Sequence, residues 1–266
     1  MYEEFYGLRA RCFSKTPDPS FLYYSKGHAE ALARLQYAVE ERDFVLLTGD
    51  IGSGKTTLSR ALIDALDDSF KPILITNPVL SPAQFLRALA KKLGVERPQH
   101  FKSDLLEQIN EQLYRLYEEK VCPVLIIDEA QLIPDKDTFD ELRLLTNYQL
   151  DDKNLVALVL IGQSELRARL KRPAYAALRQ RIGMSFHLMA LDRDETSRYV
   201  EHRLRVGGRD GELFTPAAVE ALHRLSNGIP RVINTLATGA LLNGLGAGAR
   251  YITPEAVVDA AADLGL

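Results

Sequence analysis

Apolar positions form two kinds of pattern along the first two thirds of the chain. Short unbroken apolar runs alternate with longer segments in which apolar residues recur at helical spacing. The runs predict strands over residues 44–48, 72–77, 123–129, 155–162 and 184–189. Because the run over 123–129 lacks polar alternation, it favours a parallel sheet covered on both faces. We therefore expect an α/β fold with a five-stranded parallel sheet flanked by helices.

Only helical periodicity follows the fifth predicted strand. Helices are expected over residues 192–205, 215–226, 231–245 and 254–262. Each has a start signal, for example Asp192 for the first helix and Thr215 with Pro216 for the second. We place a domain boundary near Leu191. Residues 1–191 are expected to form the α/β domain with an N-terminal strap, and residues 192–266 a small all-helical lid domain.

One glycine-rich segment lies between the first strand and the helix after it. Residues 49–56 fit the phosphate-loop (P-loop) pattern G-x-x-x-x-G-K-[ST]. Backbone N–H groups of such a loop converge on an anion, and the helix dipole adds positive charge. The nucleotide-binding residues expected here are Gly49, Asp50, Ile51, Gly52, Ser53, Gly54, Lys55, Thr56 and Thr57. Lys55 can reach the β- and γ-phosphates of ATP or ADP, and the Thr56 hydroxyl can ligate Mg²⁺.

The strand over 123–129 ends in two acids, Asp128 and Glu129. At that position Asp128 can bind nucleotide through Mg²⁺ or its waters. Glu129 can polarise an attacking water. The alternative is a buried strand that happens to end in a charged turn. Gln163 lies just past the next strand, where it can touch the γ-phosphate or the water, because ligands bind at this edge of parallel sheets.

Residues 1–28 have no regular pattern, and residues 13–24 combine aromatic side chains with two prolines. Two interpretations remain open for this strap. It either packs on the surface of the α/β domain or lines the adenine pocket. His28 begins the following helix and is expected to cap or pack, because no cysteine, histidine or carboxylate cluster accompanies it.

Composition limits the remaining possibilities. The 266 residues carry a net charge of −3, which gives no general attraction to nucleic acid or anionic membrane. Cys12 and Cys122 are far apart and in no metal-ligand spacing, which favours a reducing compartment. The N-terminus lacks the pattern of a signal peptide, and no apolar run is long enough to span a bilayer.

Taken together, these motifs resemble an AAA+ ATPase over nearly the whole chain. The resemblance is closest to the general secretion pathway protein A family and its relatives in type IV pilus and exopolysaccharide loci. Besides the P-loop, it rests on residues 2–8, 16–19, 21–23, 28–32, 125–131, 160–165, 178–182 and 228–234. The opening stretch and the Gly-Ile-Pro-Arg sequence at 228–231 are its more family-specific parts.

The resemblance implies further roles in catalysis. Lys55 and Thr56 correspond to the Walker A pair, and Asp128 and Glu129 to the Walker B acid and catalytic base. Gln163 falls at the sensor 1 position, where many relatives have a shorter side chain, and Arg231 falls at sensor 2. Asn77 matches the position that holds the base inactive until a partner binds. Arg179 or Arg181 is the expected arginine finger, which acts on the nucleotide of a neighbouring subunit.

The implied protein hydrolyses ATP with Mg²⁺ as a ring oligomer such as a hexamer. It would drive assembly of an envelope secretion, pilus or polysaccharide-export machine from the cytoplasm, at the inner membrane face through partners or an anchor beyond Leu266. Family members carry a membrane segment and a peptidoglycan-binding module there. We therefore expect either a cytosolic member or one ATPase domain of a longer protein.

Two other functions stay open. The first is a DNA-associated ATP switch like the transposition regulators, kept open by Lys91, Lys92 and the arginines between Arg167 and Arg181. The second is a nucleotide-dependent scaffold with negligible hydrolysis, against which Glu129 counts.

Overall fold

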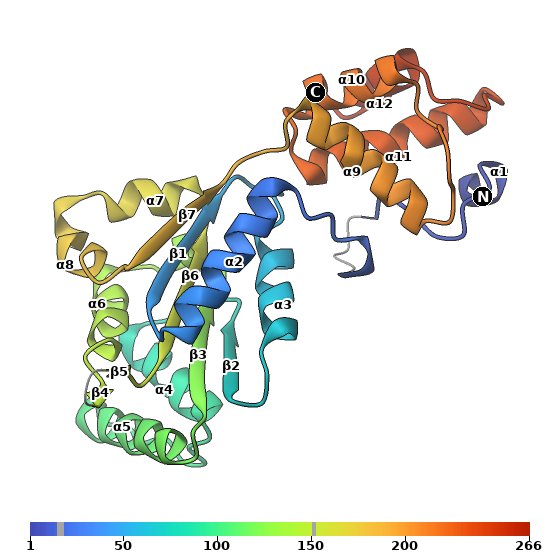
Figure 1. Ribbon diagram of the computed structural model, residues 1–266. Helices are drawn as coiled ribbons and strands as arrows, with labels where there is room; N and C mark the ends of the chain where they lie inside the picture. The colour runs from blue at the N-terminus through green and yellow to red at the C-terminus, as the bar shows by residue number, and fades with distance from the viewer. Residues whose placement is uncertain (15–18, 151–152) are drawn as a thin grey trace. The chain divides into compact units, whose positions relative to one another are not determined.

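The computed structural model describes residues 1–14, 19–150 and 153–266. Its contacts divide the chain into two compact units, whose elements are labelled in Figure 1. We call the first the helical unit; it comprises Met1–Ala29, Asp50–Thr57 and Met189–Leu266. We call the second the sheet unit; it comprises Glu30–Gly49 and Leu58–Leu188.

Five parallel strands in the order β2-β3-β6-β1-β7 form the centre of the sheet unit (Figure 1). Their bounds are Phe44–Gly49 for β1, Phe70–Ile75 for β2, Cys122–Ile127 for β3, Ala157–Gly162 for β6 and Met184–Leu188 for β7. Every residue of β1, β3 and β6 is buried, as the unbroken apolar runs predicted. The predicted five-stranded parallel sheet is confirmed.

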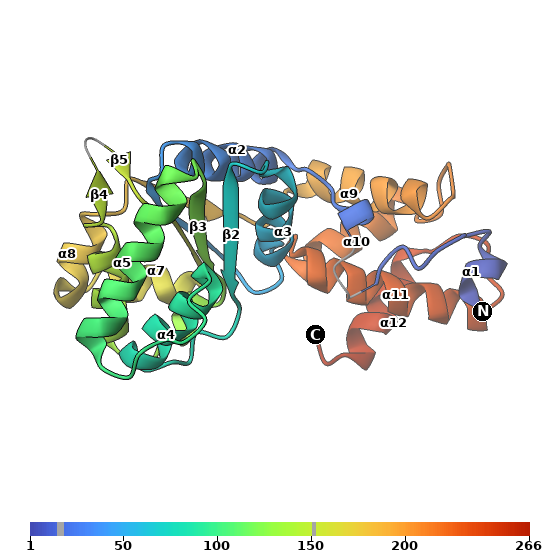
Figure 2. The same ribbon diagram turned by 90° about the horizontal axis from the view of Figure 1, so that it is seen from below.

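Alternate strand side chains enter two cores on opposite faces of the sheet. Val45, Val124 and Val159 pack in the core formed with α2 and α3. Leu46, Leu125 and Leu158 pack in the larger core formed with α4 to α8 (Figure 2). The helices are α2 (Lys26–Glu40), α3 (Lys55–Ala65), α4 (Pro82–Leu93), α5 (Lys102–Glu118), α6 (Lys136–Leu145), α7 (Ser164–Leu170) and α8 (Ala176–Arg179).

Local capping chemistry sets several helix starts. Ser81 and Gln84 form a capping box before α4, where Pro82 occupies the first turn. Asp192 and Glu195 form the same motif at α9. The sheet unit also contains elements that the apolar pattern did not predict, because they are short. These are the 3₁₀ turns η2 (Ala130–Leu132) and η3 (Pro173–Tyr175) and the antiparallel pair β4 (Gln149–Leu150) and β5 (Lys153–Asn154).

The helical unit contains the four helices predicted after residue 191 together with the start of the chain. Its elements are α1 (Tyr2–Phe5), η1 (Pro19–Phe21), α9 (Arg193–Val206), α10 (Pro216–Ser226), α11 (Pro230–Gly246) and α12 (Pro254–Asp263). A single parallel bridge pairs Phe214 with Ile252. No helix among the described residues of either unit is long and apolar enough to cross a membrane.

The N-terminal segment differs from its predicted assignment to the α/β domain. Tyr6 and Phe13 are almost fully buried in one core with Leu204 and Leu241 of the C-terminal helices. The buried Arg203 donates to the Cys12 carbonyl oxygen at 2.6 Å. Residues 1–29 therefore belong to the helical unit. Residues 16–18, part of the family-specific opening, lie outside the described residues.

Candidate functional site

The P-loop begins where β1 ends and finishes in the first turn of α3. Gly52 has φ +82° and Gly54 has φ +105°, in the left-handed region that favours glycine. A Cβ atom at Gly52 would lie 2.5 Å from the Arg231 Cβ, and one at Gly54 would lie 2.7 Å from the His28 Nε2. The sequence pattern therefore reflects both backbone conformation and close packing of the loop.

Polar groups of this loop suit an anionic ligand. Lys55 is buried, and its Nζ donates to the Asp50 carbonyl oxygen at 2.8 Å. The Ser53 hydroxyl is buried and has no hydrogen-bond partner among the described residues. Thr56 and Thr57 lie half-buried in the first turn of α3. A glycine cradle with a buried ammonium and an unsatisfied hydroxyl fits phosphate groups, whose oxygens accept several hydrogen bonds.

The two predicted acids follow β3 directly. Asp128 is buried, and its Oδ1 accepts from the Glu129 backbone N–H at 2.8 Å. Glu129 has φ +54°, which is uncommon for a residue other than glycine. Residues held in such conformations cluster at active sites and ligand clamps. The strand end therefore has a defined backbone geometry, although Arg42 and Lys120 adopt the same conformation elsewhere in the chain.

Two amide side chains hold the Glu129 carboxylate. Gln163, after β6, donates from Nε2 to the Glu129 Oε2 at 3.0 Å. Gln131, in η2, donates from its own Nε2 to the same oxygen. The Gln131 Oε1 in turn accepts from the Gln163 backbone N–H at 3.0 Å. The three side chains form one network across the adjacent strands β3 and β6, and both amide donors bind the Glu129 Oε2 and not its Oε1.

Asn77 lies two residues beyond β2, and its side chain is exposed. The described hydrogen bonds of the Glu129 side chain come from the two glutamines and not from Asn77. A role of Asn77 in holding the base therefore stays a prediction.

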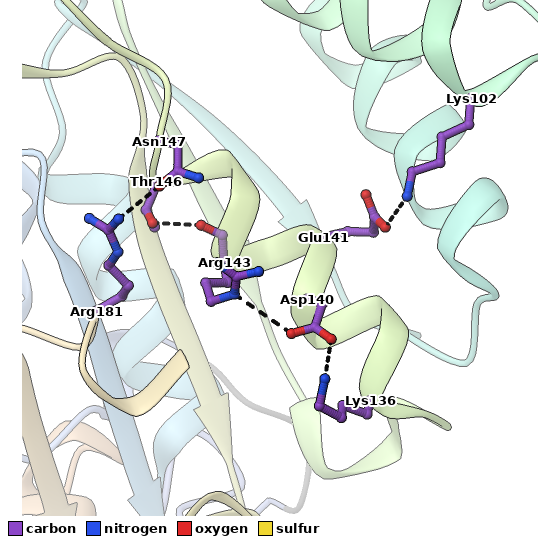
Figure 3. A network of polar contacts seen from close by, with 8 residues as sticks. All are labelled: Lys102, Lys136, Asp140, Glu141, Arg143, Thr146, Asn147 and Arg181. Carbon is purple, nitrogen blue, oxygen red and sulfur yellow. Dashed lines mark hydrogen bonds and ion pairs between the residues drawn. The ribbon is translucent and has the colours of Figure 1, made fainter. Parts of the chain in front are cut away.

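The two candidate finger arginines are exposed but differ in their partners. The Arg179 Nη1 donates to the carbonyl oxygens of Leu170 and Lys171 at 3.1 and 3.0 Å, at the end of α7. The Arg181 Nη2 donates to the Asn147 Oδ1 at 2.9 Å (Figure 3). In the same picture Glu141 pairs with Lys102, and Asp140 lies between Lys136 and Arg143. Neither candidate arginine has a described carboxylate partner that would neutralise it.

Arg231 contacts the P-loop through its backbone. Its N–H donates to the Gly52 carbonyl oxygen at 3.3 Å, in the first turn of α11, and its side chain is exposed. The His28 side chain also contacts the loop, because its Nε2 lies 3.0 Å from the Ser53 carbonyl oxygen. The sequence did not predict this contact of His28, because 25 residues separate the two groups.

Gln131 is the other residue whose contact the sequence did not predict. It lies within the stretch that carries the family resemblance, but its contact with Glu129 depends on the 3₁₀ turn after β3. The one signal in the sequence is a polar side chain two residues beyond Glu129. Gly162 makes room for it, since a Cβ there would come 3.0 Å from the Gln131 Oε1.

Comparison with known proteins agrees with this arrangement. A family model described as "AAA domain" matches residues 38–170, which include the P-loop, both acids and Gln163. General secretion pathway protein A of Aeromonas hydrophila is 40% identical over 255 residues. The match covers 95% of this chain but only 46% of that relative. The chain thus spans about half the length of the curated protein that it matches.

Solved structures share the fold at low identity. The ORC2 protein of Aeropyrum pernix superposes with a TM-score of 0.67 at 19% identity, covering 95% of this chain and 71% of that chain. Drosophila ORC bound to DNA gives 0.71 at 17% identity, covering 97% and 65%. The Holliday junction motor RuvB of Thermotoga maritima gives 0.62 at 20% identity, covering 96% and 74%.

These structural matches support the fold, and the family model matches the part of the chain that holds the P-loop and the acids. The chain therefore belongs to the AAA domain family.

Proposed function

We propose that this chain binds ATP with Mg²⁺ and hydrolyses it to ADP and phosphate. The observation that carries hydrolysis, beyond binding alone, is the Glu129 carboxylate. Two amides hold its Oε2, so the orientation of its Oε1 is fixed. A carboxylate held in this way can accept the proton of a water that attacks the γ-phosphorus. The scaffold function leaves this network unexplained.

The other residues of the site have binding roles in this proposal. Lys55 and the N–H groups of the P-loop bind the phosphates. Thr56 and Asp128 supply hydroxyl and carboxylate oxygens, which are the ligands that Mg²⁺ prefers. When bound, Mg²⁺ neutralises charge that develops on the phosphate oxygens. Gln163 orients Glu129 and the water. Arg231, at the start of α11, has the sensor 2 role.

We also propose an oligomeric active form, a ring such as a hexamer. Arg179 and Arg181 are exposed and unneutralised, as a residue acting on a neighbouring subunit's nucleotide must be. Arg181 holds a single amide oxygen, whereas Arg179 holds two carbonyl oxygens of its own chain. Arg181 therefore loses fewer hydrogen bonds than Arg179 when its side chain turns outward, and we propose Arg181 as the finger.

The test is ATP hydrolysis measured against protein concentration for the wild type and matched variants. The rate per subunit should rise with concentration if the site is completed in trans. Glu129→Gln should lower kcat at least about 100-fold, because the amide cannot accept the proton. Arg181→Ala should lower kcat about 10³-fold while binding ATP normally. Arg179→Ala serves as the matched variant and should retain more activity.

Each outcome bears on a separate part of the proposal. A rate per subunit that is independent of concentration and of both arginines would exclude the trans site. Unchanged hydrolysis in Glu129→Gln would exclude Glu129 as the base. Loss of activity in Arg179→Ala but not in Arg181→Ala would reverse the assignment of the finger.

The cellular role follows the relative named for a general secretion pathway. We propose that this chain serves an envelope secretion or export machine, on the cytoplasmic side of the inner membrane, through its partners or through a segment outside this sequence. The support is 40% identity across 95% of this chain. Co-purification of the wild type with membrane fractions, and its loss on removal of candidate partner proteins, would test this role.

A second candidate function has support from one cavity of the sheet unit. The cavity, of about 320 Å³, is lined by Arg167, Lys171, Arg179 and His187 together with six uncharged residues. Its lining contains no carboxylate, so it favours anions. The alternative is an ATP-dependent switch that binds DNA phosphates here. DNA affinity should then fall steeply with salt and weaken in Arg167→Ala/Lys171→Ala. Binding that is absent at low salt would exclude it.

A further inference from the structure

His28 is a buried histidine whose side chain takes no part in the catalytic roles proposed above. It lies in the first turn of α2 and is only 4% exposed. Its Nδ1 is 2.7 Å from the Ser25 Oγ, and its Nε2 is 3.0 Å from the Ser53 carbonyl oxygen. The ring therefore bridges the start of α2 and the P-loop, and both segments belong to the helical unit.

The partners of the ring fix its tautomer. A carbonyl oxygen can only accept, so the hydrogen of the neutral ring lies on Nε2 and is donated to Ser53. The Ser25 Oγ accepts from the His28 backbone N–H at 3.3 Å, and its own hydrogen is donated to the His28 Nδ1. All polar groups of the Ser25–His28 pair are satisfied in this arrangement. Burial lowers the pKa of His28, which agrees with a neutral ring.

The bond to Ser53 has a direct consequence for the loop. In a trans peptide the C=O and the following N–H point in opposite directions. His28 draws the Ser53 carbonyl oxygen toward α2, so the Gly54 N–H is directed the opposite way. N–H groups of a P-loop are its phosphate ligands. We propose that His28 is a positioning residue for nucleotide, which fixes the Ser53–Gly54 peptide so that its N–H faces the phosphates.

Close packing supports this role over a simple capping role. A Cβ atom at Gly54 would lie 2.7 Å from the His28 Nε2, so the ring sits directly against the loop. The start of α2 is itself anchored, because the Lys26 N–H donates to the Glu195 Oε1 at 3.0 Å. Glu195 also closes the capping box at the start of α9. The ring is thus held on a fixed support, as a positioning residue must be.

The inference rests on the proposed binding of nucleotide, and the test uses the full chain with a fluorescent ADP analogue. Gln carries its amide nitrogen as many bonds from the backbone as the His Nε2, and Asn carries it at the place of Nδ1. His28→Gln should therefore keep the bond to Ser53, whereas His28→Asn and His28→Ala should lose it.

The expected result is a pattern across these variants. His28→Asn and His28→Ala should weaken ADP binding about five- to tenfold, in line with the loss of one buried hydrogen bond. His28→Gln should stay within about twofold of the wild type. The KM for ATP should rise in the weakened variants with kcat nearly unchanged, because the peptide contacts phosphate both before and during reaction. The matched control is His223→Ala, which loses a comparable bond between the His223 Nδ1 and the Thr196 hydroxyl elsewhere in the helical unit.

Two results would overturn the role. If His28→Asn binds ADP as tightly as the wild type while Lys55→Ala does not bind, nucleotide binding stands and the positioning role fails. If His28→Gln loses as much affinity as His28→Ala, and the melting temperature without nucleotide falls in both, His28 is only structural. A wild type that binds no nucleotide would instead contradict the proposed function, and the inference would fail with it.

Discussion

At the scale of single residues, the orientation of Glu129 depends on two amides. Gln131→Ala removes one donor to the Glu129 Oε2 and leaves the Gln163 backbone N–H without its acceptor, the Gln131 Oε1. In the proposed mechanism this network orients the base and does not bind ATP, so we expect kcat to fall about tenfold or more with KM nearly unchanged. Steady-state hydrolysis measures both constants. Gln180→Ala is the matched control, since that side chain is exposed and has no described hydrogen bond.

The same network predicts that the effects of substituting Gln131 and Gln163 are coupled. Gln131 and Gln163 bind the same carboxylate oxygen and each other, so their effects should not multiply. The double variant Gln131→Ala/Gln163→Ala should lose less activity than the product of the single losses. Fully multiplicative losses would show that the two glutamines act independently and would contradict a shared role.

Cys12 gives a prediction about pH. Burial raises the pKa of its thiol to about 11 from an ordinary value near 9. Because its pKa is higher in the folded form, the thiol keeps its proton to a higher pH there than in the unfolded form. The contribution of Cys12 to the unfolding free energy is therefore complete below pH 9 and is lost between pH 9 and 11. The wild type should lose about 2 kcal/mol of unfolding free energy more than Cys12→Ala over this interval. Urea unfolding at both pH values measures the difference, and equal losses would contradict it.

At the scale of elements, the strands and most helix starts could be predicted from the sequence. Buried parallel strands leave unbroken apolar runs, and caps such as Ser81 and Asp192 leave local signals. The positions of the P-loop and the two acids at strand ends could be predicted because each motif consists of consecutive residues. The contacts of Gln131 and His28 could not, because they depend on how a short 3₁₀ turn and a distant loop pack.

The turn before α11 requires glycine at position 228. Gly228 has φ +71°, and a Cβ there would lie 2.0 Å from the Leu191 carbonyl oxygen. Gly228→Ala should therefore lower the unfolding free energy by about 2 kcal/mol or more, from strain together with the clash. Gly211→Ala is the control, because Gly211 has φ +102° but no atom within 4 Å of an added Cβ. Equal losses in thermal unfolding of the two variants would show that backbone strain alone accounts for the effect.

At the scale of the whole molecule, the assignment of residues 1–29 could not be predicted. An aromatic side chain shows that a segment will be buried but does not identify the core that buries it. Phe13 and Phe21 enter a core made mainly of residues after 191, about 180 or more positions away. Local patterns carry no record of such distances. The chain therefore folds into two units, each made of segments that are not contiguous in sequence.

This division into units predicts which core is destabilised when one N-terminal aromatic side chain is removed. Phe13 is 1% exposed, and its ring meets that of Phe214 edge-on at 5.8 Å between centroids. Phe13→Ala should cost about 3–5 kcal/mol, because it leaves a cavity in the core of the helical unit. The cost belongs to that core, so amide hydrogen exchange should accelerate in α11 and α12 more than in β3. Phe5→Ala should change little, since Phe5 is 44% exposed. Accelerated exchange in β3 without change in α11 would place the segment with the sheet unit, as the sequence had suggested.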